Sequence, residues 1–349
     1  MTTMMAAVWY GPGRENFRLE SVSRPDPGPG EVLIKVRKCF FSAMHVRAIQ
    51  VGHVKHKPPE IFGRMLAGDV VAVGTGVSRI REGMRVTVNP ERPCGECFYC
   101  QVGEAGHCVK PTVLRPGGMA EFVCVPAALS GGIFELPPSV SYEDGAYTET
   151  LACILQGMAL SNIGLSDCVA IIGSGGVGLT FVQLARMRGA TRIVVAGKYD
   201  DSLQQASALG ASRTVNVTRE SLADVVMAQT QGYGADTVIE AAGSAETYEQ
   251  ALTLLRCGGT AVCFGGTPPG TKFQGDPNLI HYRSLKIYGS YRYIPDHFRR
   301  ALELICTKQI DLRPIITHSV PFSKLTSNAV DIYCQPNCRA LVIDMAEDA

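Results

Sequence analysis

Residues 168–188 constrain the fold more than any other part of this 349-residue chain. The apolar run 168–172 is typical of a buried parallel strand. A glycine-rich turn, Gly173-Ser174-Gly175-Gly176-Val177-Gly178, separates it from a helical pattern over 179–188. In that setting the free N–H groups and the dipole of the helix N-terminus bind phosphate. The segment therefore predicts a dinucleotide site, with Gly173, Gly175, Gly176, Val177 and Gly178 as cofactor-binding residues.

Strand and helix patterns continue to alternate beyond this turn. We expect a strand at 192–196 and a helix at 201–209, then strands at 237–240, 260–264 and 285–289. Such alternation predicts an α/β fold with a doubly wound parallel sheet of the Rossmann type, over residues 155–290. Gly243 and Gly265, which follow two of these strands, complete the predicted cofactor contacts.

The end of the second strand bears on the choice between NAD and NADP. A carboxylate at this place accepts hydrogen bonds from the adenosine ribose of NAD. This chain has Gly197, Lys198 and Tyr199 there instead. The glycine removes a negative charge, the lysine can neutralise a 2′-phosphate, and the tyrosine can stack on adenine. The sequence therefore favours NADP(H); the alternative for Lys198 is an ordinary solvated surface position.

Four cysteines lie close together in the first half of the chain: Cys94, Cys97, Cys100 and Cys108. Four thiolates complete a tetrahedral zinc shell and leave no position open for water or substrate, so the predicted metal site is structural. Disulfides and free thiols are the alternatives. The N-terminal residues lack the pattern of a secretory signal, so we expect a cytoplasmic, reducing setting, which disfavours disulfides.

Charge and hydropathy argue against two classes of partner. The 33 basic and 32 acidic residues give a formal net charge of +1, and no block of like charge is present. Neither nucleic acid nor a membrane surface is therefore expected as a partner. No apolar run approaches the length of a membrane span. These features leave a small-molecule substrate as the expected partner.

Nearly the whole chain resembles the medium-chain zinc-type alcohol dehydrogenases, in the branch of the sorbitol, threonine and aminocyclitol dehydrogenases. The resemblance rests on the cysteine cluster, the glycine turn and the segments 31–36, 68–74, 149–153 and 281–291. It implies a mainly β, GroES-like catalytic domain over residues 1–154, completed by residues 291–349. It also implies a homodimer or homotetramer formed by pairing nucleotide domains.

The chain departs from this family at the catalytic zinc site. The first zinc cysteine corresponds to Ser42, the ligand histidine to Arg64, and the acidic residue after it to Met65. Serine is a poor zinc ligand, and a guanidinium cannot coordinate a metal. Only Glu149 and Cys153 remain in the region of the third ligand. The resemblance therefore implies that the structural zinc is kept and the catalytic zinc is lost.

The candidates for chemistry without that metal are Ser42, His45, Arg64 and Glu149. Arg64 can stabilise developing negative charge as a fixed cation, and His45 or Ser42 can relay a proton. The alternatives are an ion pair between Arg64 and Glu149, an Arg64 that binds an anionic substrate group, and a His45 that only packs. An alignment that recruits Cys39 and a nearby histidine would restore a zinc site.

We therefore expect an NADP(H)-dependent oxidoreductase that reduces a carbonyl of a sugar- or cyclitol-like substrate by hydride transfer without catalytic zinc. The segment 281–291 favours this interpretation, because it resembles polyol dehydrogenases. One alternative is reduction of an activated C=C or C=N (iminium) bond in a biosynthetic intermediate, which needs less polarisation. Another is a non-catalytic NADP(H)-binding subunit, because cofactor binding does not by itself establish turnover.

Overall fold

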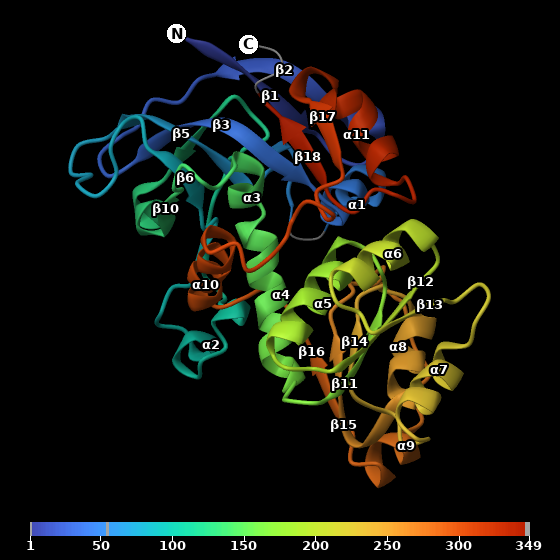
Figure 1. Cartoon of the computed structure of the whole chain (residues 1–349). Coiled ribbons are helices and arrows are strands. Elements are labelled where there is room, and N and C mark those ends of the chain that lie inside the picture. Colours follow the sequence, from blue (N-terminus) through green and yellow to red (C-terminus); the bar gives the residue numbers. More distant parts are fainter. Residues whose placement is uncertain (1, 54–55, 346–349) are drawn as a thin grey trace. The chain divides into compact units, whose positions relative to one another are not determined.

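The computed structural model describes residues 2–53 and 56–345, which fall into two compact units (Figure 1). The first unit comprises Met1–Ala152 and Tyr293–Ala349, and the second comprises Cys153–Arg292. The boundaries expected from the sequence, at residues 154 and 290, each lie two residues from these. Among the described residues, no helix has the length and hydropathy needed to cross a bilayer.

The first unit is mainly β. Its largest sheet runs β10-β6-β5-β3-β18-β17, with β9 paired to β3, and a smaller sheet runs β2-β1-β4. The strands of these two sheets are β1 (Thr3–Trp9), β2 (Phe17–Ser23), β3 (Val32–Phe41), β4 (Glu60–Ile61), β5 (Leu66–Val73), β6 (Arg85–Val88), β9 (Phe122–Val125), β10 (Ile133–Glu135), β17 (His318–Pro321) and β18 (Leu341–Asp344). Their inward faces enclose one core that includes Trp9, Phe41 and Phe62.

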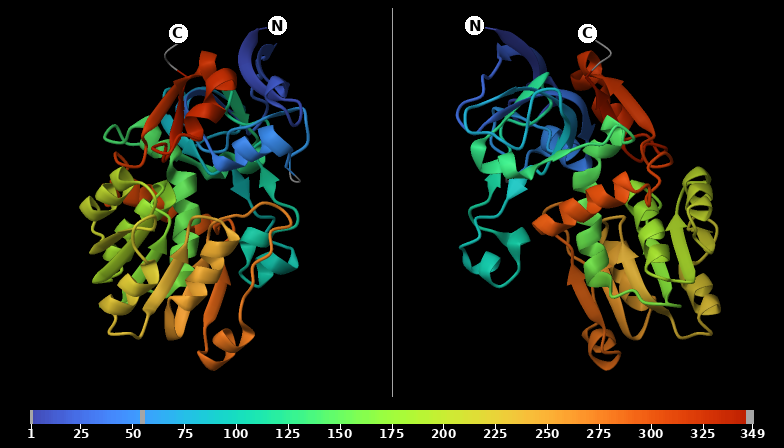
Figure 2. Two further views of the ribbon diagram at one scale, coloured as in Figure 1. Left: turned by 90° about the vertical axis from the view of Figure 1, so that its right-hand side faces the viewer. Right: turned by 60° about the vertical axis from the view of Figure 1, so that its left-hand side comes forward.

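The two ends of the chain meet in this unit. Strand β18 pairs antiparallel with β3, so that Leu341 lies opposite Phe41 and Ile343 lies opposite Cys39. Figure 2 shows the C-terminal segment, in red, beside the N-terminal strands, in blue. All four of these side chains are buried. The C-terminal segment is therefore part of the core of the first unit.

Short helices and a small two-stranded sheet complete the first unit. The helices are α1 (Ala43–Val51), α2 (Phe98–Gln101), α3 (Tyr142–Ala146), α10 (Pro295–Cys306) and α11 (Leu325–Tyr333), with 3₁₀ helices η1 (Arg14–Asn16), η2 (Ala105–His107), η3 (Ala127–Gly132) and η4 (Phe322–Lys324). The small sheet pairs β7 (Glu91–Arg92) with β8 (Thr112–Val113). The boundary between the units falls within α4 (Thr148–Ser161).

The second unit is a doubly wound parallel sheet, as predicted. Its strand order is β13-β12-β11-β14-β15-β16, and every pairing is parallel. The strands are β11 (Cys168–Ile172), β12 (Arg192–Gly197), β13 (Arg213–Asn216), β14 (Ala235–Glu240), β15 (Leu255–Cys263) and β16 (Lys286–Gly289). The helices are α5 (Gly176–Met187), α6 (Asp200–Ala208), α7 (Leu222–Gln229), α8 (Ala245–Thr253) and α9 (Pro277–Tyr282). The order reverses between β11 and β14, which is where ligands bind in such sheets.

Two elements begin at least three residues earlier than their sequence patterns predict. Helix α5 begins at Gly176 rather than at residue 179, because the glycine turn itself forms the first helical turn and Leu179 N–H donates to Gly175 O at 2.9 Å. Strand β15 begins at Leu255 rather than at residue 260. The pair Gly258-Gly259, which is typical of a turn, lies instead inside a strand whose register with β14 is irregular.

The glycine turn allows a matched test of packing. A Cβ on Gly178 would lie 1.9 Å from the carbonyl oxygen of Gly173, whereas a Cβ on Gly175 would meet nothing within 4 Å. We expect Gly178→Ala to lower the free energy of unfolding by about 1–3 kcal/mol despite the better helix propensity of alanine. Gly175→Ala, at an ordinary φ of −75°, should leave it almost unchanged. Thermal unfolding of both variants checks this, and equal melting temperatures would contradict the packing argument.

Candidate functional site

The four clustered cysteines converge in a lobe that follows β7. The sulfur atoms of Cys94, Cys97, Cys100 and Cys108 all lie within 4.8 Å of one another. The Cys94–Cys108 and Cys97–Cys100 sulfur pairs are 3.5 and 3.6 Å apart, far beyond the ~2.05 Å of a disulfide bond, and all four are free thiols. The disulfide alternative is therefore not what the structure shows. Four thiol sulfurs converging on one point fit a structural zinc ion.

Backbone N–H groups of the lobe favour the thiolate form of two of these cysteines. N–H groups of Val109 and Cys100 lower the pKa of Cys97 to about 6, and those of Glu96 and Cys97 lower the pKa of Cys94. Thiolates are the form that binds zinc. Desolvation, by contrast, raises the pKa of Cys100, whose thiol would be deprotonated on binding a cation. The donor set thus fits a dication that holds all four sulfurs as thiolates.

Ser42 and His45 begin helix α1 of the first unit. Ser42 is the N-cap, and its backbone N–H donates to Nδ1 of His45 at 2.9 Å. The Ser42 hydroxyl lies 3.1 Å from the same nitrogen. The two residues form a capping box in which His45 takes the place that Glu or Gln usually fills. Both predicted candidates therefore stabilise the start of one helix.

The environment of His45 keeps its ring neutral. The side chain is buried and packs against Phe41 and Phe62, with ring centroids 5.3 and 5.2 Å away. Burial, followed by the charges of His56, Arg64 and His53, lowers its pKa to about 3. Because Nδ1 accepts an N–H, the proton lies on Nε2, which is buried without a hydrogen-bond partner among the described residues. These observations support the packing role of His45 over the proton relay.

Arg64 has an ion-pair partner that the sequence did not indicate. Its Nη1 lies 3.4 Å from Oε2 of Glu91 in β7, and the two side chains are 25% and 15% exposed. An ion pair between Arg64 and Glu149 was one of the alternatives that the sequence left open. The first turn of α4, which contains Glu149, does lie beside this segment, because the Thr150 hydroxyl contacts the Met65 sulfur at 2.9 Å. The structure thus places Arg64, Met65 and the start of α4 in one region of the first unit.

The glycine turn of the second unit leaves room for a ligand. Gly173 has a φ of +114°, which favours glycine, and its N–H donates to Ala196 O at 2.9 Å. A side chain at Gly175 would meet no protein atom within 4 Å, so the backbone there is open. Gly176, Val177 and Gly178 form the first turn of α5. All five predicted residues therefore lie at the start of one helix, where phosphate binds.

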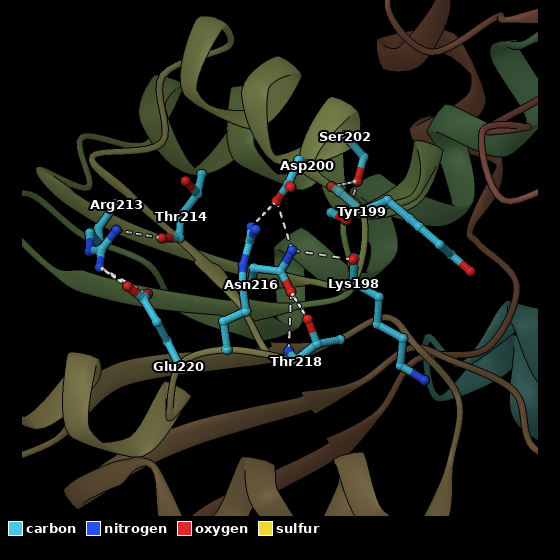
Figure 3. A network of polar contacts seen from close by, with 11 residues as sticks. Lys198, Tyr199, Asp200, Ser202, Arg213, Thr214, Asn216, Thr218 and Glu220 are labelled. Carbon is cyan, nitrogen blue, oxygen red and sulfur yellow. Dashed lines mark hydrogen bonds and ion pairs between the residues drawn. The ribbon is translucent and has the colours of Figure 1, made fainter.

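The predicted NADP determinants lie at the end of β12, where Gly197 approaches Ser174 of the glycine turn. A Cβ on Gly197 would lie 2.1 Å from the Ser174 hydroxyl, so this position at the end of β12 excludes larger side chains. Figure 3 shows the amino group of Lys198 and the hydroxyl of Tyr199 pointing away from the neighbouring polar network. Tyr199 is 46% exposed, as a base-stacking platform requires.

The polar network next to these residues was not predicted. Asp200, the first residue of α6, pairs with Arg219 and accepts a hydrogen bond from Asn216 at 2.7 Å. Asn216 also donates to the backbone oxygen of Lys198 at 3.3 Å. A carboxylate therefore does follow the strand end closely, but a guanidinium and an amide already bind it. Arg219, a basic residue shortly after β13, was the sequence feature that could have indicated its ion pair with Asp200.

Gly243 and Gly265 lie in two loops that touch each other. Gly243 follows β14 with a φ of +78°, and a Cβ there would lie 2.8 Å from the Gly266 oxygen. A Cβ on Gly265, after β15, would lie 2.5 Å from the Gly243 nitrogen. The predicted cofactor residues of the second unit thus all lie at the carboxyl edge of the parallel sheet.

Two family models match the chain, and together they span both units. Residues 28–138 match the alcohol dehydrogenase GroES-like domain, and residues 176–307 match the zinc-binding dehydrogenase domain. An L-threonine 3-dehydrogenase from Pyrococcus horikoshii is 30% identical over 325 residues, which cover 91% of this chain and 92% of that protein. This chain belongs to the zinc-type alcohol dehydrogenase family.

Further relatives agree with this assignment. A sorbitol dehydrogenase from Halalkalibacterium halodurans is 28% identical over 328 residues, which cover 92% of this chain and 94% of that protein. Among solved structures, a protein assigned as a zinc-binding dehydrogenase from Sinorhizobium meliloti, bound to NADP, is 32% identical. It superposes with a TM-score of 0.89 over 99% of this chain and 100% of that one. The chain is thus an oxidoreductase of this family, with both of its expected domains.

The cysteine lobe yields a prediction for metal content. We expect one zinc ion per purified chain, and Cys100→Ser should lose most of it, because removal of one thiolate opens the tetrahedral shell. The variant should also unfold at a temperature lower by several degrees, since binding energy of the metal contributes to folding. Elemental analysis and thermal unfolding measure both effects. Cys257→Ser, at an exposed cysteine outside the lobe, is the control and should keep its zinc.

Proposed function

We propose that this chain is an NADP(H)-dependent reductase of a carbonyl on a sugar- or cyclitol-like substrate, and that it works without a catalytic zinc. The observation that carries the proposal is Arg64, a partly buried guanidinium at the position of a family zinc ligand. A fixed positive charge there replaces the electrostatic role of the metal. The threonine and sorbitol dehydrogenase relatives support a carbonyl or alcohol as the reacting group.

The preference for NADP rests on the end of strand β12. Gly197 has no carboxylate to repel a 2′-phosphate, and Lys198 makes no ion pair among the described residues. Asp200, the acid that follows, is already bound to Arg219. The Sinorhizobium meliloti relative was solved with NADP, which supports the same choice.

The proposed loss of the catalytic zinc rests on what the departing residues do instead. Ser42 caps helix α1, and Arg64 pairs with Glu91. The Thr150 hydroxyl donates a hydrogen bond to the Met65 sulfur. A hydroxyl, a guanidinium and a thioether make a poor set of zinc ligands. Finding two zinc ions per chain would therefore contradict this part of the proposal.

The residues of the first unit suggest how a carbonyl would be reduced. When bound, NADPH supplies the hydride. Arg64 can donate N–H groups to the carbonyl oxygen, where negative charge develops as the hydride arrives at carbon. The oxygen then needs a proton. Of the two predicted donors, Ser42 is a partly exposed residue, whereas His45 is buried and neutral. Ser42 is therefore the better candidate to pass a proton from solvent.

Location and partners complete the proposal. All thirteen cysteines are free thiols, as expected for a chain kept in the reducing cytoplasm. The near-neutral net charge fits a small-molecule substrate rather than nucleic acid. We also propose a homodimer, or a tetramer built from such dimers, through the edge strand β16.

The role of Arg64 is tested by a pair of variants. Arg64→Ala should lower kcat/KM for carbonyl reduction by about 10²-fold or more, because the developing charge loses its cation. The dissociation constant of NADPH should not change. Glu91→Gln removes the ion pair but keeps Arg64, and it should retain far more turnover. Normal turnover in Arg64→Ala would remove this residue from the mechanism, and equal losses in both variants would reduce its role to ion pairing.

A substrate panel separates the three functional interpretations. NADPH oxidation with polyol-derived ketones should be faster than with enones or iminium compounds. Faster oxidation with the latter would favour the C=C or C=N reductase, because such acceptors need less polarisation. No oxidation with any compound, together with tight NADPH binding, would favour a non-catalytic subunit.

The assembly prediction concerns the edge of the parallel sheet. Strand β16 is exposed along its whole length, with Ile287 38% and Tyr288 41% exposed, so its backbone can pair with a second copy. Size-exclusion chromatography with light scattering should show a dimer or a tetramer. Replacing both side chains with lysine should lower the oligomer mass, because like charges meet at the interface. A monomeric wild-type chain would contradict this assembly.

A further inference from the structure

Glu240 lies at the point of the parallel sheet where the strand order reverses, outside the glycine turn. It is the last residue of β14 and lies in register with Ile172, the last residue of β11. The strand order of the sheet reverses between these two strands. Glu240 is fully buried, at 0% exposure. A carboxylate is rarely buried to this degree without a specific role.

The hydrogen bonds of Glu240 fix two loops at the carboxyl edge. Its Oε1 accepts the backbone N–H groups of Ala242 and Gly243, at 2.8 and 2.6 Å, and the Thr247 hydroxyl at 2.8 Å. Its backbone oxygen accepts the N–H groups of Phe264 and Gly265, at 2.9 and 3.0 Å. One residue therefore holds the loop after β14 and the loop after β15.

The charge of Glu240 has no cation beside it in the structure. Each of these donors is neutral, and no ion pair involves Glu240 within residues 2–53 and 56–345. Its second oxygen, Oε2, is buried and makes no hydrogen bond there. A Cβ on residue 265 would lie 2.7 Å from Oε2, so the glycine there avoids a steric clash with this oxygen.

Neighbouring groups respond to this carboxylate. Burial, and then the charge of Glu240, raise the pKa of Cys263 to about 11. Burial, the charge of Cys263 and that of Glu240 raise the pKa of Tyr248 to about 12. Burial thus disfavours negative charge at the carboxyl edge of the sheet. A cation that binds there would offset this cost.

The position of Glu240 relates it to one end of a bound dinucleotide. The glycine turn approaches the loop after β14, because a Cβ on Gly173 would lie 3.1 Å from the carbonyl carbon of Ala241. The pyrophosphate binds at that turn. In a sheet of this kind the adenosine half would lie over β12, where Lys198 is found, and the nicotinamide half would extend toward β14 and β15. The two loops that Glu240 holds belong to this second half.

We propose that Glu240 biases a bound nicotinamide toward its oxidised form. The ring of NADP⁺ carries a positive charge and that of NADPH does not, so an unpaired carboxylate at this edge stabilises the oxidised ring. When NADPH gives up a hydride, with its electron pair, to a carbonyl carbon, the ring gains this charge and the carbonyl oxygen takes up a proton. Glu240 thereby makes bound NADPH a stronger hydride donor. This inference rests on the proposed NADP(H) function.

The test is the ratio of two dissociation constants. In Glu240→Gln the side chain keeps its size and one acceptor oxygen but loses its charge. We expect NADP⁺ binding to weaken by roughly tenfold relative to NADPH binding. NADPH fluorescence titration, with NADP⁺ as competitor, measures both constants on the full chain. The phosphates and adenosine are common to both forms, so their contributions cancel in the ratio.

A matched variant separates charge from loop geometry. Thr247→Val removes a neutral donor to the same oxygen and keeps the carboxylate, so it should leave the ratio unchanged. If Glu240→Gln changes the dissociation constants of NADP⁺ and NADPH by the same factor, the proposal is overturned and Glu240 has only a structural role. If Glu240→Gln does not fold, the wild-type chain decides, because a preference for NADPH over NADP⁺ of more than about tenfold contradicts the proposed bias. A wild-type chain that binds neither form would refute the proposed function itself.

Discussion

The close approach of the Gly178 backbone to the Gly173 carbonyl oxygen is the constraint on which the second unit depends. A Cβ at Gly178 would lie 1.9 Å from that oxygen, so only glycine lets α5 begin directly after β11. This tight turn leaves the backbone at Gly175 open, and it places Gly173 against the loop after β14. The predicted phosphate site, the strand end at Gly197 and the loops held by Glu240 share one edge of the sheet because the strands are parallel, and the short turn begins α5 at that edge.

Sequence patterns predicted the features that depend on local spacing. The strand–turn–helix segment and the cysteine cluster each lie within about twenty residues, and the doubly wound sheet followed from the alternation of elements. Contacts between distant segments could not be read in this way. Arg64 and Glu91 are separated by 27 residues, and only the path of β7 brings them together. The role of Glu240 was also missed, because its partners Phe264 and Gly265 belong to another strand end.

Under the proposed loss of the catalytic zinc, Ser42 and His45 keep a local role at the start of helix α1. Ser42 and His45 satisfy each other in a capping box, so helix α1 begins with internal hydrogen bonds. The same geometry fixes the His45 tautomer, and burial between Phe41 and Phe62 keeps the ring uncharged. A sequence pattern that places a histidine three residues after a serine fits a relay and a cap equally well. Burial favours the cap, and burial is a property of the folded core.

Arg64 and Glu240, the residues central to the two proposals, carry opposite charges. Each charge is opposite to one that develops during carbonyl reduction. A carbonyl that accepts a hydride develops negative charge on oxygen, and the nicotinamide that loses it becomes positive. Arg64, in the first unit, is a cation partly withdrawn from water, and Glu240, in the second, is an anion fully buried. Electrostatic terms grow as water is excluded, so both charges act most strongly where they are held. In the proposed zinc-free mechanism, the electrostatic work of a catalytic metal is thus divided between a basic residue for the substrate and an acidic residue for the cofactor.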